Sequence, residues 1–459
     1  MNKKRLYSYL AFVLLLAIIT IINNDGEIYK GGMLFYYAAC IICCLCFFLV
    51  DLFRQQMKIL PMTGAFYEAI LYLLALFVYV QRMIGGVEII DYKANELNPA
   101  KNMSNTLLTL LGAVAICIVV SLLMKNFADE LTLPIGAGCI LLVVLILFAA
   151  HFAPPVNHAH IKLFGILVML FIIPMVPMAV GFFVSNKALN RINDKRTIRI
   201  GPIALFAWIG ICCLLAVLNN DLGFILLIGG AVGLVILSEL RGKIIKYMLV
   251  ALALCAVIFL YLTSSSVRNR FDQAFSPYHV AYETVPDELW EKLNNNPKSL
   301  ETEERTMLIA AQNAQKQLTR NKGLFTNGWY GAGYGSVTVS DNPERNNDYV
   351  IQSMGIEMGI LFLFAFILFS YTFAIYLYHI AYSAGESPFQ VGVMKTATWL
   401  FIIPIIYIPL SNFGILPLTG ISYPFMAAGK AVFWAYAALA GIIGGILEKN
   451  HNHWNSFIE

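Results

Sequence analysis

Long runs of apolar residues alternate with short polar segments along almost the whole chain. Runs near 20 residues are long enough to cross the ~30 Å hydrocarbon core of a membrane as helices. The pattern predicts an all-α polytopic integral membrane protein with about 12 (10–12) transmembrane helices and one large extracellular loop. The expected spans are 6–23, 32–50, 62–81, 104–124, 131–150, 162–185, 201–218, 222–239, 245–263, 349–378, 392–411 and 424–446.

The composition supports this fold class. The chain has 459 residues, of which 59% are hydrophobic and 13% charged, whereas soluble domains carry about 25% charged residues. The first segment has a basic head and an apolar body without a small-x-small cleavage site, which is typical of a retained signal anchor. A soluble globular protein is therefore excluded.

The charges of the short loops predict the orientation. Lys and Arg gather on one side of the spans, and since basic loops stay in the cytoplasm, both termini are expected there. The chain then divides into an amino-terminal transmembrane bundle (1–263), a large extracellular loop (264–348), and carboxy-terminal transmembrane helices with a short cytoplasmic tail (349–459).

The extracellular loop separates its charges. Acidic residues crowd between Glu283 and Glu304, where "DELWEKL" predicts a short amphipathic helix. The flanks are basic, and they include Arg268, Arg270 and Lys322. A basic rim beside a membrane suits anionic headgroups or diphosphates. The alternative is a solvated loop whose charges only keep it soluble.

Three polar patches fall on the outer side. The first is "LNNDLGFILL", where Asp221 stands at the mouth of an apolar run. Ionisable groups in membrane segments are costly and tend to be functional or paired. An aspartate before a helix is also a good N-cap, so both interpretations of Asp221 stay open.

The second patch is "GLFTNGWYGAGYGSVTVSDNPERNNDYVIQSMGIEMG", a glycine-rich approach to an apolar helix. Its glycines let the backbone come close to a ligand. A helix that starts at Asp348 places Asp348, Gln352 and Gly359 on one face, and it pairs Ser353 with Glu357 at i, i+4. The alternatives are Asp348 as an N-cap and Glu357 as a structural group bonded to a neighbouring helix.

The third patch is "SNFGILPLTGISYPFMAAGK", in which prolines and glycines interrupt apolar sequence. Irregular backbone at membrane depth is tolerated only where it lines a cavity or is buried in protein. The patch is therefore either part of a site or a purely structural connection.

Taken together and in this order, the patches resemble the SEDS family (shape, elongation, division and sporulation), the RodA/FtsW/SpoVE-type peptidoglycan glycosyltransferases. The family's "QPDLG" is similar to "NNDLG", and its "R…DP" is similar to "RNRFDQAFSP". Its "GxGxG…LPExxTDFIFxxxxEExG" is similar to "GAGYGSVTVSDNPERNNDYVIQSMGIEMG", with Glu344, Asp348, Glu357 and Gly359 on motif positions.

The third patch is similar to the family's "GxxPxTGxPLPFxSxGG", and the resemblance covers residues 200–446. The first half has no counterpart of the family's "GAxRW" and "QPSE". Lys430 stands where a small residue is expected, and Ser276 replaces the aspartate before Pro277. The chain is thus a divergent relative.

The resemblance implies polymerisation of lipid II at the outer face of the bacterial cytoplasmic membrane, with inversion and with Asp348 as general base. Supporting or substrate-binding roles fall to Glu344, Glu357, Arg268, Arg270, Lys322, Asp221, Thr419 and Pro424. It also implies a class B penicillin-binding protein transpeptidase as partner, besides membrane lipids, and no nucleic acid.

No metal ligands are singled out. All nine cysteines lie in apolar runs, where they are expected to be small packing residues. No cofactor is identified, and a divalent cation (Mg²⁺ or Mn²⁺) is left open.

Three other functions also remain open. A lipid II flippase would need polar residues deep in several helices, whereas the polar groups here concentrate at the outer edge. A polymerase or ligase of the O-antigen type would be expected to use paired arginines and a loop histidine, and the loop has His279 alone. A catalytically degenerate scaffold for a transpeptidase would explain the missing first-half motifs.

Overall fold

The computed structural model describes most of the chain from residue 99 onward. The described residues are 99–126, 131–154, 160–187, 189–190, 200–240, 243–263, 265–283, 285–295, 300–326, 329, 331, 349–383, 385–426 and 430–450. The expected spans 6–23, 32–50 and 62–81 lie outside these ranges, as do Glu344 and Asp348.

The described chain is almost entirely helical, with one two-stranded hairpin. Its elements are α4 (Pro99–Lys125), α5 (Thr132–His151), β1 (Lys162–Leu163), β2 (Ile166–Leu167), α6 (Met169–Ser185), α7 (Ile200–Leu218), α8 (Leu222–Phe224), the π-helical turn η3 (Ile225–Gly229), α9 (Gly230–Glu239), α10 (Lys243–Thr263), α11 (Ser265–Phe275), α12 (Pro277–Tyr282), α13 (Asp287–Asn295), α14 (Thr302–Thr326), α15 (Val350–Ser383), α16 (Pro388–Asn412) and α17 (Lys430–Lys449). Strands β1 and β2 are antiparallel, with Lys162 opposite Leu167.

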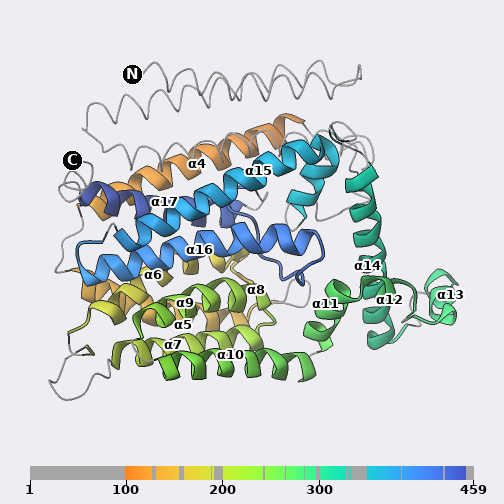
Figure 1. The fold of residues 1–459 in the computed structure, drawn as a ribbon, viewed down its shortest axis with the longest axis horizontal. Coiled ribbons are helices and arrows are strands. Elements are labelled where there is room, and N and C mark those ends of the chain that lie inside the picture. The colour runs from red at the N-terminus through yellow and green to blue at the C-terminus, as the bar shows by residue number, and fades with distance from the viewer. Residues whose placement is uncertain are drawn as a thin grey trace.

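The long helices lie side by side in a bundle (Figure 1). Eight helical segments of the described chain are long and apolar enough to cross a membrane, and the apolar helix α6 accompanies them. Each of the nine spans expected within the described chain coincides with an apolar helix. The prediction of a polytopic helical membrane protein is confirmed.

The ends of three expected spans differ from the observed helices. The span 162–185 starts late, at Met169, because the hairpin β1–β2 precedes α6. Helix α15 runs on to Ser383, and α17 begins only at Lys430, since Pro424–Met426 form a turn instead of helix. An apolar sequence indicates that a segment lies within the membrane, but it does not show whether that segment is a helix or a buried turn.

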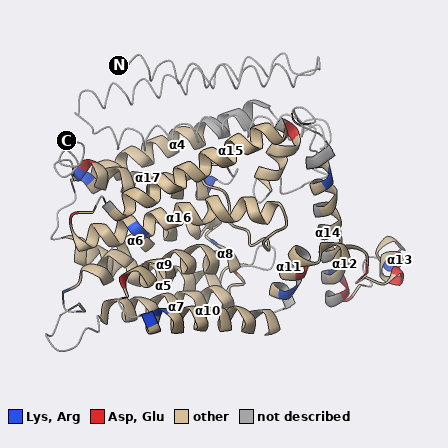
Figure 2. Cartoon of the chain, viewed as in Figure 1, with Lys and Arg blue, Asp and Glu red and all other residues tan. Residues whose placement is uncertain are grey.

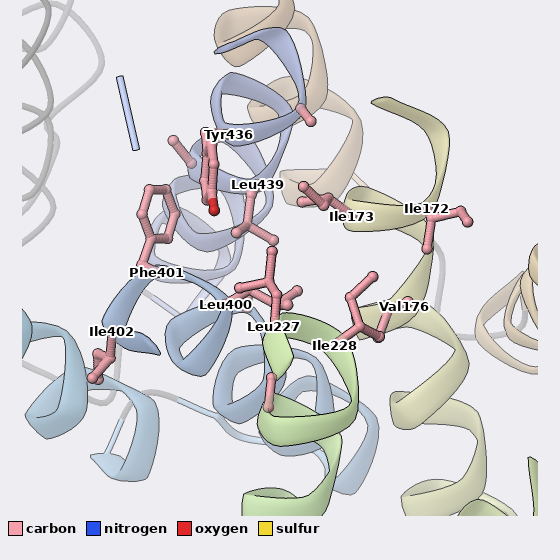
Figure 3. Packing of buried hydrophobic residues seen from close by; sticks show 14 of the residues in the cluster. Ile172, Ile173, Val176, Leu227, Ile228, Leu400, Phe401, Ile402, Tyr436 and Leu439 are labelled. Carbon is pink, nitrogen blue, oxygen red and sulfur yellow. The ribbon is translucent and has the colours of Figure 1, made fainter. Parts of the chain in front are cut away.

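Helices α16 and α17 form the centre of the bundle. Side chains of α6, η3, α16 and α17 meet there, among them Val176, Ile228, Leu400 and Leu439 (Figure 3). Helix α17 also packs closely on α4 through glycine: a Cβ at Gly441 would lie 2.6 Å from the backbone oxygen of Cys117. Small residues let membrane helices approach in this way.

Charged residues occupy the ends of the helices and leave the middle of the bundle almost free of charge (Figure 2). At the end that holds the carboxyl terminus of α9, Lys395 Nζ lies 2.6 Å from Glu239 Oε1. At the carboxyl ends of α4 and α17, Lys125 lies 3.6 Å from Glu448. These ion pairs link neighbouring helices at one end of the bundle.

The opposite end, where α8 begins and α10 ends, is the one that the charge pattern assigns to the outside; we call it the outer end. Helices α11–α14 gather beside it, and α14 runs across the direction of the bundle helices (Figure 1). Two small apolar clusters hold these helices together, one of them formed by Val285, Leu300, Leu308 and Ala311. The amphipathic helix predicted from "DELWEKL" is confirmed as α13, packed on that cluster through Leu289, Trp290 and Leu293.

Candidate functional site

The outer end brings the first and third patches into contact. A Cβ at Gly223 would lie 3.0 Å from the backbone oxygen of Thr419 and 3.6 Å from Ile421. The start of α8 thus touches the connection between α16 and α17 directly. The absence of a side chain at Gly223 is what allows this approach.

Asp221 acts as the N-cap of α8. Its Oδ1 accepts a hydrogen bond of 3.0 Å from the backbone N–H of Phe224, which satisfies one of the donors that a helix start leaves unpaired. The capping interpretation of Asp221 is therefore correct. The preceding Asn219 is buried, and its Nδ2 donates to the carbonyl of Leu147 at 3.0 Å.

The second patch reaches the third through the first turn of α15. The backbone N–H of Gln352 donates to Asn412 Oδ1 of α16 at 3.2 Å. This N–H belongs to a helix start and needs an acceptor from elsewhere. Asn412 is completely buried, so α16 itself supplies the cap for this position of α15.

The Gln352 side chain extends the connection to α14. Its Nε2 donates to Asn321 Oδ1 at 2.6 Å, whereas its buried Oε1 has no hydrogen-bond partner in the structure. Gln352 is completely buried. Three elements of the outer end are thus joined at one glutamine, one turn after the position of Asp348.

Helix α15 is broken at Gly359, whose φ of 88° and ψ of 167° are not helical. The backbone of Trp329 and Gly331 lies against this break: the N–H of Leu361 donates to the carbonyl of Trp329 at 3.4 Å. A Cβ at Gly331 would lie 2.3 Å from the backbone oxygen of Glu357. The glycine-rich approach is therefore pressed against the segment that carries Glu357.

Glu357 lies within the protein, with 1% of its surface exposed, and Ser353 is also buried. Both residues take part in polar interactions. A carboxylate at this depth needs polar partners, because an unpaired charge in a membrane protein interior is costly. The position fits a structural or supporting group more simply than one that touches substrate.

The third patch forms a connection folded back into the bundle. Phe425 is 1% exposed, has a φ of 59°, and packs against Phe401, Phe433 and Tyr436. The Tyr407 hydroxyl donates to the carbonyl of Pro417. The end of the connection, residues 423–426, is thus buried in protein, whereas Ile415 and Gly420 are exposed.

The two candidate residues of this connection, Pro424 and Thr419, differ in how far they are buried. Pro424 is buried. Thr419 is half-buried, and its Oγ1 is enclosed without a hydrogen-bond partner in the structure.

The basic candidates differ in what they contact. Arg268 is exposed, and its guanidinium donates to the carbonyl of Leu262 at 2.7 Å, at the last turn of α10. This is a helix-capping contact, so the Arg268 side chain caps the carboxyl end of α10. Lys322 is exposed on α14, next to Asn321, and so lies one residue from the Gln352 contact. Arg270 lies on α11, and its side chain falls outside the described part of the structure.

No metal centre is visible in the described part of the chain: no group of three or more His, Cys, Asp or Glu residues there is arranged to hold an ion.

The sequence analysis did not single out Asn321 and Asn412. A weak signal existed for Asn412, a polar residue at the end of an apolar run, but Asn321 lies in a polar helix where nothing distinguishes it.

Comparisons with known proteins find a family similar to the carboxy-terminal part of the chain. A family model for the FtsW, RodA and SpoVE proteins, described as cell cycle proteins, matches residues 317–452, which include α15, α16 and α17. The "Probable peptidoglycan glycosyltransferase FtsW" of Borreliella burgdorferi is 29% identical over 124 residues. Residues 317–452 of this chain are thus similar to this family.

This similarity has definite limits. The match to FtsW covers 27% of this chain and 34% of that relative, so it spans about a third of the relative's length. A solved structure described as "Structural coordination of polymerization and crosslinking by a peptidoglycan synthase complex" has a TM-score of 0.50 and 14% identity, and covers 82% of this chain and 97% of that one. A Thermus thermophilus RodA structure has a TM-score of 0.43 and 14% identity, with the same coverage. The first of these structures shares its fold with this chain over 82% of the chain's residues.

Proposed function

We propose that the protein is a peptidoglycan glycosyltransferase that joins lipid II units into glycan strands at the outer face of the bacterial cytoplasmic membrane. The observation that carries this proposal is the meeting of all three motif patches at the outer end. Gly223 lies against Thr419, and Gln352 donates to Asn412. These contacts join segments that are up to about two hundred residues apart in the chain.

Asp348 is the proposed general base. It directly precedes Tyr349 and Val350, which are buried at the start of α15. A carboxylate has an ordinary pKa of about 4, and partial burial raises it toward a more effective base. Asp348 would take the proton of the acceptor sugar's 4-hydroxyl while that oxygen attacks the anomeric carbon of the donor.

The reaction balances without a covalent enzyme intermediate. The oxygen–carbon bond of the new glycosidic link forms, and the bond from the anomeric carbon to the diphosphate oxygen breaks. Its electron pair leaves with undecaprenyl diphosphate, so the configuration inverts. A cation beside the leaving diphosphate favours this step, and Lys322 is the best-placed candidate because Arg268 already caps α10.

The contacts on either side of Asp348 would hold it in position and would take no part in the reaction itself. The Gly331–Gly359 contact holds the start of the loop that leads to Asp348, and the Asn412–Gln352 bond holds the helix that follows it. Glu344, Glu357, Thr419 and Pro424 are proposed as supporting groups. A class B penicillin-binding protein transpeptidase is the proposed partner.

A catalytically degenerate scaffold is the second candidate function. The family model matches only from residue 317, and the first half has no counterpart of two family motifs. Purified protein, given fluorescent lipid II with and without the transpeptidase, distinguishes the two. Glycan strands that are lost in Asp348→Asn support the enzyme, and no polymer from well-folded wild type under either condition supports the scaffold.

A further inference from the structure

Two histidines lie together at the outer end, beside the "NNDLG" turn. His151 is the last residue of α5, and His160 lies just before β1. Their ring centres are 5.5 Å apart, and the rings are tilted by 42°. Neither histidine has a role in the proposed transfer reaction.

Hydrogen bonds fix the protonated nitrogen of each ring. Asn219 Nδ2 donates to the carbonyl of Leu147 at 3.0 Å, so its Oδ1 is the atom that faces His151 Nδ1, at 3.1 Å. Because Oδ1 only accepts, the His151 Nδ1 carries the hydrogen.

The same argument applies to His160. Its Nδ1 lies 2.6 Å from the carbonyl oxygen of Ala153, which only accepts. A neutral imidazole has one N–H. In its neutral form each ring therefore has its acceptor lone pair on Nε2.

The Nδ1 contacts of both rings are of the kind that metal-binding histidines make. Such histidines donate their other ring N–H to a carbonyl or carboxylate, which fixes the ring orientation. With Zn–N bonds near 2.0 Å, two imidazoles on one tetrahedral ion have ring centres roughly 5–6 Å apart. Imidazole nitrogen suits Zn²⁺, Cu²⁺ or Ni²⁺ and not Mg²⁺.

We propose that His151 and His160 bind one divalent transition-metal ion of the Zn²⁺ class through their Nε2 atoms. The described part of the chain arranges no third His, Cys or carboxylate with them, so water or an anion completes the coordination. The ion would link the end of α5 to the hairpin. It would also reach the turn before Asp221, because the backbone N–H of His160 donates to the carbonyl of Asn219 at 2.9 Å.

The test measures zinc binding to the detergent-purified full chain after chelator treatment. Wild type is expected to bind one Zn²⁺ at least ~10-fold more tightly than His151→Gln or His160→Gln, the loss typical of removing a ligand or its orienting partner. It should also gain thermal stability with ZnCl₂ but not with MgCl₂. His279→Gln is the matched control, since His279 lies on α12 and pairs with Glu283; its zinc binding should equal that of wild type.

Zinc-edge X-ray absorption of the wild type needs no variant, and it should show scattering from two imidazoles. Equal zinc affinity in the wild type and the double variant would overturn the proposal. So would an absorption spectrum with fewer than two imidazoles, which would leave the two histidines as hydrogen-bonded structural residues.

Discussion

Gly331 and Gly359 face each other so closely that neither position has room for a side chain. A Cβ at Gly359 would lie 2.2 Å from the backbone oxygen of Trp329, and one at Gly331 would lie 2.5 Å from the backbone nitrogen of Gly359. The φ of Gly331 is 80° and that of Gly359 is 88°. The loop that leads to Asp348 is held to α15 by this pair.

Gly359→Ala should therefore displace the loop. At this φ and ψ the backbone conformation is essentially restricted to glycine, and another residue costs about 1–3 kcal/mol before any clash is counted. We expect a lower melting temperature and a loss of polymerase activity larger than the loss of stability explains. Gly233→Ala on α9 is the matched control, because a Cβ there meets nothing within 4 Å; equal effects of the two variants would contradict this account.

Asn412→Ala should loosen the start of α15. It removes the acceptor of the Gln352 N–H inside the protein, and an unsatisfied buried donor costs about 1–3 kcal/mol. Hydrogen exchange at residues 349–353 should speed up. Ser411→Ala is the control, since the Ser411 hydroxyl donates to the carbonyl of Ile408 within its own helix. Unchanged exchange in Asn412→Ala would show that α15 is capped by other means.

The Lys395–Glu239 ion pair should stabilise the bundle as a unit. The two side chains are 11% and 14% exposed, and Lys395 Nζ also lies 5.0 Å from the centre of the Tyr382 ring. Lys395→Met alone should cost about 3 kcal/mol, because it removes the ammonium group from a carboxylate that is only 14% exposed. The double variant Lys395→Met with Glu239→Leu should recover most of that loss. A double variant less stable than either single variant would contradict this reasoning.

Acidification should open the contact between α13 and α14. Glu304 accepts hydrogen bonds from the Glu301 backbone N–H and from Lys292, each at 3.0 Å, and these contacts lower the pKa of Glu304 below its usual 4.5. Because the folded pKa is the lower one, the stabilisation is present above the unfolded pKa and is lost as the pH falls through the folded pKa.

The protection of α13 amides from hydrogen exchange, taken relative to the intrinsic exchange rate at each pH, should thus fall in wild type as the pH drops below 4.5. In Glu304→Gln the amide cannot ionise, so less of this pH-dependent loss of protection should remain. Glu288→Gln, at an exposed position of α13, should behave like wild type. A Glu304→Gln profile identical to wild type would show that the acid sensitivity has another origin.

Much of the bundle could be predicted from the sequence because apolar run length depends on membrane thickness alone. The "NNDLG" and "PLTG" patches were both expected on the outer side, but their direct contact was not predicted. The break at Gly359 was not, because the feature that fills it, the Trp329–Gly331 backbone, comes from a polar segment almost thirty residues earlier. Asp221 had two interpretations: the Phe224 N–H contact shows the cap, and a further functional role stays a prediction. The role of Arg268 was missed for a similar reason: its acceptors are backbone carbonyls, which no side-chain pattern reveals.

The most direct test of the central claim compares Asp348→Asn with wild type in lipid II polymerisation by purified protein. Asp287→Asn makes the same chemical change on exposed α13 and serves as control. The account predicts glycan strands from wild type and Asp287→Asn, and a loss of at least ~10²-fold in rate for a folded Asp348→Asn, the contribution of a general base. Polymer synthesis by Asp348→Asn at the wild-type rate would contradict it.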